Sequence, residues 1–216
     1  MNEKNIKVQN TAAENSHGPI GLQIRDLHVI RGMRMVIDGL SHQQQPGDIY
    51  CLKGPNGSGK STLLRTIANR VPLASGQISC PVPVIYVGHD DGLSGSISGR
   101  QNLIGWAKIN GFAHPASAID RALSCFATDR FANISTYRLS RGQRRRLALA
   151  RLKLAPANSL WLLDEPNASL DQATNAMLDA AVIAHADSGG MVLAATHFDF
   201  AVAASPQSIT LPEQTE

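Results

Sequence analysis

A glycine-rich segment that contains a single lysine constrains the fold of this chain more than any other feature. Residues 54–61 read GPNGSGKS, which fits the pattern G-x-x-x-x-G-K-[ST]. The short apolar run 49–52 precedes this segment, and apolar residues at helical spacing follow it over 60–71. A strand, a glycine-rich turn and a helix in this order predict a P-loop, in which backbone N–H groups and the positive end of the helix surround phosphates. The alternative is a glycine-rich turn with an accidental Lys-Ser, and the flanking elements favour the P-loop.

Each residue type in this loop suits a nucleoside triphosphate. Glycines let the backbone curl so that successive N–H groups point inward. We expect Lys60 to reach the β- and γ-phosphates as a catalytic residue, and the Ser61 hydroxyl to bind Mg²⁺. The residues expected to contact the nucleotide here are Gly54, Pro55, Asn56, Gly57, Ser58, Gly59, Lys60, Ser61 and Thr62.

The remaining pattern predicts an α/β fold with a parallel core, because apolar strands alternate with helices. Strands are expected near 22–29, where the first would be an edge strand, and at 49–52, 84–87, 160–163, 191–195 and 208–211. Helices are expected at 60–71, 140–155 and 172–187, with broken helical pieces over 96–128. We expect a polar leader over 1–20 and a single domain over 21–216, with a helical subdomain over about 89–155.

Composition excludes several classes of protein. With 43% hydrophobic and 17% charged residues, the chain is an ordinary globular sequence and not a disordered, collagen-like or coiled-coil one. No run approaches the roughly 18 to 20 apolar residues that span a bilayer, and residues 1–20 lack the apolar core of a signal peptide. Any membrane role is therefore expected to be played from outside the bilayer. The three widely spaced cysteines predict reduced thiols in a cytosolic compartment.

A second phosphate-binding helix start is predicted at residues 139–143, which read LSRGQ. Ser140 suits the N-cap and Gln143, three residues later, completes a capping box, while Gly142 leaves the N–H groups accessible. The alternative is an ordinary capped surface helix. Arginines between 141 and 151 alternate with leucines, which predicts a helix packed on one side with a solvated basic face. No aromatic residues accompany them and the net charge is only +3, so we expect no nucleic acid partner.

Two adjacent carboxylates end the apolar run 160–163. Successive side chains of a strand point in opposite directions, so Asp164 and Glu165 are expected to differ in role. Asp164 suits the Mg²⁺ shell, and Glu165 suits a general base that activates water. The alternative is two ordinary charges in a turn.

Taken together, these motifs resemble those of ATP-binding cassette (ABC) ATPases over about residues 20–212. LSRGQ is similar to the LSGGQ signature, LWLLDEP to the Walker B strand, and Ser169-Leu170-Asp171 to the D-loop. The resemblance implies a RecA-like P-loop NTPase cassette with a mostly parallel sheet, an antiparallel β edge and a short helical insert. It also implies ATP and Mg²⁺ as ligands, and a nucleotide-sandwich dimer with itself or a second cassette. Asp171 would line the dimer seam, and His197, after the last long apolar strand, would be the switch histidine at the γ-phosphate.

More narrowly, the chain resembles the ATP-binding subunits of cytochrome c maturation heme exporters. The segment YVGHD at 86–90, the run LSRGQRRRLALARL and the strand LWLLDEP carry this resemblance. It implies a peripheral protein on the cytoplasmic face of the inner membrane. Its partners would be an integral-membrane heme-exporter subunit and other cytochrome c maturation proteins. Its ATP hydrolysis would drive heme export or the release of a heme-loaded chaperone.

Three positions depart from most cassettes. His89, expected at the nucleotide, stands where most have the Q-loop glutamine; Arg141 replaces the first signature glycine; and Arg31 stands where an aromatic residue stacks on adenine. Two other functions remain open. The chain could be the ATP-hydrolysing subunit of an exporter for lipid, drug or ion, or a soluble ABC ATPase that acts on DNA or ribosomes. The soluble class usually joins two cassettes or carries a long coiled-coil insertion, which 216 residues do not accommodate.

Overall fold

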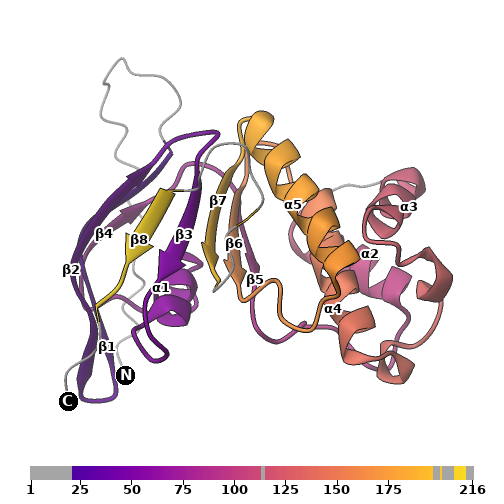
Figure 1. Cartoon of the computed structure of the whole chain (residues 1–216), viewed down its shortest axis with the longest axis horizontal. Helices are drawn as coiled ribbons and strands as arrows, with labels where there is room; N and C mark the ends of the chain where they lie inside the picture. Colours follow the sequence, from indigo (N-terminus) through magenta and orange to yellow (C-terminus); the bar gives the residue numbers. More distant parts are fainter. Residues whose placement is uncertain (1–20, 113–114, 197–199, 201–206, 213–216) are drawn as a thin grey trace, which may run out of the picture.

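The structure is a computed structural model that describes residues 21–112, 115–196, 200 and 207–212 (Figure 1). The expected leader, 1–20, and the expected switch histidine, His197, lie outside the described residues.

Two β-sheets form one side of the molecule (Figure 1). A five-stranded sheet has the order β5-β6-β7-β3-β8, and all of its strand pairs are parallel. Its strands are β3 (Ile49–Lys53), β5 (Val84–Val87), β6 (Leu160–Asp164), β7 (Met191–Ala195) and β8 (Gln207–Thr210). A three-stranded antiparallel sheet has the order β2-β1-β4, with β1 (Leu22–Arg31), β2 (Arg34–Gln44) and β4 (Ser75–Ser79). The parallel core and the antiparallel β edge are therefore confirmed.

The expectation that the first strand lies at an edge is wrong. β1 is the central strand of its sheet and pairs with β2 on one side and β4 on the other. The sequence pattern does not reveal these two partners, because most of their residues are exposed and β4 contains a glycine. Both strands depend on pairing with β1, which is not visible in local periodicity.

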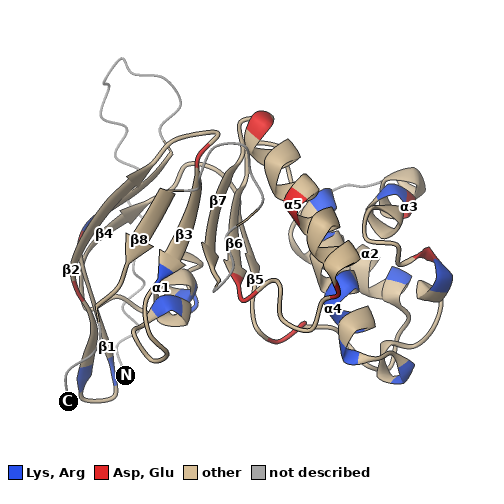
Figure 2. Ribbon diagram, in the orientation of Figure 1, with Lys and Arg blue, Asp and Glu red and all other residues tan. Residues whose placement is uncertain are grey.

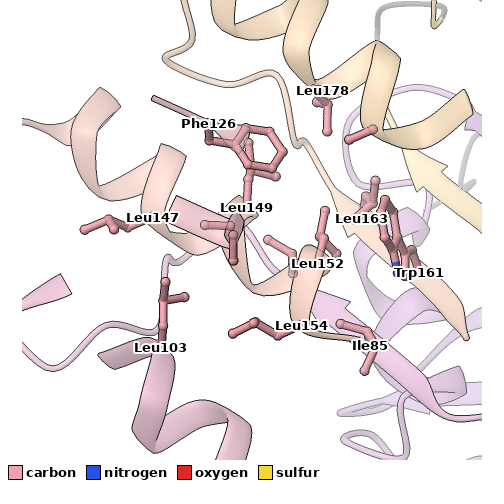
Figure 3. Packing of buried hydrophobic residues seen from close by; sticks show 14 of the residues in the cluster. Ile85, Leu103, Phe126, Leu147, Leu149, Leu152, Leu154, Trp161, Leu163 and Leu178 are labelled. Carbon is pink, nitrogen blue, oxygen red and sulfur yellow. The ribbon is translucent and has the colours of Figure 1, made fainter. Parts of the chain in front are cut away.

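Both faces of the parallel sheet are buried, which explains the continuous apolar runs of its strands. On β6, Leu160 and Leu162 face α1 (Lys60–Ile67) and the antiparallel sheet. Trp161 and Leu163 face the opposite cluster, which holds helical side chains (Figure 3). The alternation of side chains along a strand thus divides the core into two clusters, one on each side of the sheet.

The described residues between β5 and β6 include three helices and three 3₁₀ turns, of which α2 and α3 lie farthest from the sheets (Figure 1). They are α2 (Gly99–Ile109), α3 (Ala116–Cys125), α4 (Arg141–Ala150) and three 3₁₀ turns at Asp129–Phe131, Thr136–Arg138 and Arg151–Leu154. α5 (Gln172–Asp187) matches its expected range. α2 ends before Gly111 and Pro115 directly precedes α3, so the break expected between these helical pieces is confirmed. Among the helices described, none is both long and apolar enough to cross a bilayer.

Candidate active site

The P-loop connects β3 to α1 and has the backbone conformation that its glycines predict. Gly54, Gly57 and Gly59 have φ values of 142°, 84° and 99°, which favour glycine. A Cβ at Gly59 would also crowd Val36 of β2. No side chain caps the start of α1, so its first N–H groups are available to phosphate oxygens.

Lys60, the first residue of α1, is directed back into the loop. Its ammonium donates hydrogen bonds to the carbonyls of Gly54 at 2.7 Å and Pro55 at 2.9 Å. Ser58 is buried, and within the described structure its hydroxyl has no hydrogen-bond partner. A buried ammonium and an unpaired hydroxyl in one curled loop suit a polyanion.

The next residue of α1 joins this loop to the acidic end of β6. The Ser61 hydroxyl donates to Asp164 Oδ1 at 2.8 Å, although the two residues are 103 positions apart in the chain. The Tyr86 hydroxyl donates to the other oxygen, Oδ2, at 3.1 Å. The structure thus brings together the two residues expected to bind Mg²⁺.

Glu165 follows Asp164 but has a different environment. Asp164 is 1% exposed, whereas Glu165 is half-buried and has a left-handed φ of 49°. Its N–H donates to the carbonyl of Ala195 on β7 at 2.8 Å, which helps to hold this unusual conformation. The two neighbouring carboxylates therefore differ in burial.

The expected capping box begins α4. Ser140 Oγ accepts from Gln143 N–H at 3.2 Å, and the Gln143 side-chain oxygen accepts from Ser140 N–H at 2.9 Å. Gly142 packs so closely on the carbonyl of Ser169 that a Cβ there would lie 3.1 Å from it. The signature segment and the D-loop of one chain are thus in contact.

The other expected ligand residues lie in separate places. Asp171 is the N-cap of α5: its Oδ1 accepts from Thr174 N–H at 2.8 Å, and hydrogen bonding to Thr174 lowers the pKa of its carboxyl. His89 lines a cavity of about 340 Å³ between the loop after β5 and the start of α4. Asp90, Asp91, Arg141 and Arg144 share this cavity, which is therefore lined by charges of both signs.

The expectation of a solvated basic face on α4 is only partly right. Arg145 of α4 and Arg151, the first residue of the 3₁₀ turn that follows, are only 3% and 7% exposed, and their guanidinium groups donate to the carbonyls of Gly88 and Gly92. Sequence reasoning missed Tyr86 and Arg145 as site residues. For Tyr86 the available signal in the sequence was its place near the end of the predicted strand 84–87, shortly before His89.

These features define the class of the protein as a P-loop nucleotide-binding cassette. The P-loop is joined to the acidic end of a parallel strand, and a capped helix follows the helical insert. In agreement, a family model described as ABC transporter matches residues 37–168, more than half of the chain.

Curated relatives narrow this class. Cytochrome c biogenesis ATP-binding export protein CcmA of Paracoccus denitrificans is 42% identical over 179 residues, which are 82% of this chain and 83% of the relative. CcmA of Ruegeria pomeroyi is 43% identical over 179 residues, 82% of this chain and 85% of that protein. CcmA of Rhodospirillum rubrum is 40% identical over 202 residues, 88% of this chain and 82% of that protein. The chain therefore belongs to the ABC transporter family, in the group of the CcmA proteins.

Solved structures have the same fold. An ABC transporter ATP-binding protein from Pyrococcus furiosus superposes with a TM-score of 0.74 at 24% identity, covering 88% of this chain and 96% of that one. A dimeric, post-hydrolysis ATP-binding cassette with bound ADP and Pi superposes with a TM-score of 0.71 at 21% identity, covering 82% and 88%. At these identities the likeness extends to the fold alone.

Proposed function

We propose that this chain is the ATP-hydrolysing subunit of an ABC transporter that serves cytochrome c biogenesis. The observation that carries the proposal is the hydrogen bond between Ser61 and Asp164, which joins the phosphate loop to the carboxylates at the end of β6. The kinship with CcmA proteins supports the choice of transporter.

The P-loop is proposed to bind the phosphates of ATP. The backbone N–H groups of residues 56–62, at the loop and the start of α1, supply donors and positive potential for the phosphates. Lys60 exchanges its hydrogen bonds to two loop carbonyls for bonds to the β- and γ-phosphates, where its charge stabilises the transition state.

The carboxylate of Glu165 is proposed to act as the general base in ATP hydrolysis. Glu165 accepts a proton from a water molecule as the water oxygen attacks the γ-phosphorus, and the bond to the bridging oxygen of ADP breaks. His197 is proposed to hold the γ-phosphate and lies outside the described residues. ADP and inorganic phosphate are the products.

The oxygen donors at the strand end fit Mg²⁺. A hydroxyl and one carboxylate, Ser61 and Asp164, lie within hydrogen-bond distance, and the described residues contain no group of three or more His, Cys, Asp or Glu that could hold a metal. Such a sparse oxygen set suits an ion that also binds substrate phosphates. Held by Ser61 and Asp164, Mg²⁺ would supply positive charge that helps to neutralise the phosphates.

The proposed site is completed by a second cassette. Ser140, Gly142 and Gln143 present a helix start to the γ-phosphate held by the P-loop of the partner, and Asp171 lies at the seam. This arrangement is supported by the exposure of Ser140, and by the contact between Gly142 and the D-loop residue Ser169. His89 is proposed to sense the nucleotide from the loop after β5.

The transporter partners are also proposed. An integral-membrane heme-exporter subunit and other cytochrome c maturation proteins would hold the chain on the cytoplasmic face of the inner membrane. The energy of ATP would drive export of heme or release of a heme-loaded chaperone. Another exporter substrate, such as lipid, drug or ion, is the alternative that the following experiment separates.

A strain that carries Lys60→Ala tests this function. We expect it to make heme and b-type cytochromes normally and to lack c-type cytochromes, because the loop loses the cation that neutralises the phosphates. Heme staining and difference spectra measure both classes. Lys153→Ala, which removes an exposed lysine, is the control and should leave both unchanged. Normal c-type cytochromes in the Lys60→Ala strain would contradict the assignment to cytochrome c biogenesis.

A further inference from the structure

We propose that Arg145 is a positioning residue that holds Glu165 of its own chain in place for hydrolysis. The proposal rests on the function proposed above and assigns a role to a residue that does not touch the nucleotide. Arg145 belongs to α4, a helix that carries several arginines (Figure 2).

The Arg145 guanidinium is buried and donates to four backbone carbonyls. Nη2 donates to Asp164 at 3.0 Å and to Glu165 at 2.8 Å. Nε donates to Pro166 at 3.3 Å, and Nη1 donates to Gly88 at 2.6 Å. Three consecutive peptide units at the end of β6 and the start of the loop that carries His89 thus meet on one side chain.

Removing this guanidinium from water requires compensation, and its partners supply it. Burial lowers the pKa of Arg145, and the nearby carboxylate of Asp91, 3.7 Å from Nη1, opposes that shift. Four carbonyl dipoles accept most of its donors, and such hydrogen bonds to a charged group are stronger than neutral ones. The planar fork of arginine suits several acceptors at once, which a lysine cannot match.

These contacts fix the peptide of Glu165 on both sides. Its N–H donates to Ala195 of β7, and its carbonyl accepts from Arg145 of α4. The left-handed φ of 49° is unfavourable for a glutamate and persists only where the surroundings hold it. The direction of the carboxylate therefore depends on Arg145, although the two side chains need not touch.

The start of α4 does not depend on Arg145. The capping box uses only Ser140 and Gln143, which bond to each other. A substitution at Arg145 is therefore expected to impair the site that uses the Glu165 of the same chain. The site of the partner, to which that chain contributes the start of α4 and Asp171 but not Glu165, should keep its activity.

The test uses the full chain with Arg145→Gln. We expect kcat for ATP to fall about tenfold or more, the scale of an impaired general base, while ATP affinity stays within about twofold. Lys153→Gln, which removes an exposed positive charge from the 3₁₀ turn after α4, is the matched control and should behave as wild type. If Arg145→Gln does not fold, as judged by circular dichroism, Arg145→Lys replaces it, because it keeps the charge and reaches fewer carbonyls.

Mixed dimers with a Lys60→Ala chain locate the effect, since only one site of such a dimer hydrolyses ATP. With Arg145→Gln on the chain that carries the intact P-loop, hydrolysis should be slow. With Arg145→Gln on the Lys60→Ala chain, it should match the mixed dimer without this substitution. Equal loss in both placements, or no loss in either, would overturn the positioning role. Absence of hydrolysis by the wild-type chain itself would instead overturn the proposed function, and this inference with it.

Discussion

The carboxylate of Asp164 accepts a hydrogen bond on each oxygen, from the hydroxyls of Ser61 and Tyr86. The Tyr86 side chain can reach Asp164 because residue 88 is a glycine. A Cβ at position 88 would lie 2.8 Å from the tyrosine ring. The Tyr86 hydroxyl also accepts from Arg65 Nε at 3.3 Å, and Arg70 lies over its ring. One tyrosine thus orients the acidic residue on which Mg²⁺ binding is proposed to depend.

We expect Tyr86→Phe to keep the fold and to raise the Mg²⁺ concentration needed for half-maximal ATPase activity about fivefold. The lost hydrogen bond is worth about 1 kcal/mol, which corresponds to that factor. Titration of ATPase activity with Mg²⁺ measures the shift. Tyr137→Phe, at an exposed tyrosine, is the control. An unchanged Mg²⁺ requirement in Tyr86→Phe would show that Ser61 alone orients Asp164.

At this scale the sequence predicts the residues whose type and spacing form a motif. The P-loop, Asp164, Glu165 and the Ser140–Gln143 capping box all occur where local pattern places them. The role of Arg145 could not be predicted from the sequence. It donates to backbone carbonyls 19 to 57 positions away, and every residue has a backbone carbonyl, so no residue type marks its partners.

At the scale of elements, the packing at the end of α5 and in the turn to β7 predicts that stability depends on pH. His185 of α5 is 6% exposed and stacks on Trp161 of β6, with ring centroids 3.8 Å apart and planes 8° apart. One ring nitrogen lies 2.9 Å from the carbonyl of Ser159. Gly190 in the turn leaves room for this ring, since a Cβ there would collide with it. Burial lowers the pKa of His185 from 6.5 to about 4, so the folded chain keeps it neutral.

Stability should therefore decrease as the pH falls below 6.5. His185 is protonated below that pH in the unfolded chain, whereas in the folded chain it stays neutral until about pH 4. Between pH 7 and 4.5 this histidine is expected to reduce the free energy of unfolding by about 2 kcal/mol. Urea unfolding of wild type and His185→Phe at both pH values measures the difference. The variant, which keeps an aromatic ring, should lose about 2 kcal/mol less than wild type. Parallel losses would mean that His185 is not the group responsible.

Elements with a strong local period were predicted to within a few residues, and elements without one were not. α5 and β7 have the expected ranges, whereas α1 ends at Ile67 instead of near residue 71. β2 and β4 were missed because each is stabilised chiefly by its hydrogen bonds to β1. The same hidden pairing made β1 look like an edge strand.

At the scale of the whole molecule, the candidate site lies where the carboxyl ends of the parallel strands meet α1 and the helices between β5 and β6. Ligands of open α/β sheets bind in this position. β3 delivers the P-loop, β5 the loop with His89, and β6 the two carboxylates. Through Arg145, α4 contacts the loop after β5 and the end of β6, and through Gly142 it contacts Ser169 of the D-loop. The proposed dimer would place the start of this helix against the nucleotide of the partner.

ATP hydrolysis by the purified Glu165→Gln variant tests the central claim most directly. Glutamine keeps the size of the side chain and removes the basic carboxylate, so phosphate release should fall by about 100-fold or more while ATP binding persists. With ATP present, the variant should accumulate as a dimer in size-exclusion chromatography. Asp187→Asn, at an exposed carboxylate that ends α5, should hydrolyse ATP at the wild-type rate. Wild-type phosphate release by Glu165→Gln would contradict the account, because the base would then lie elsewhere.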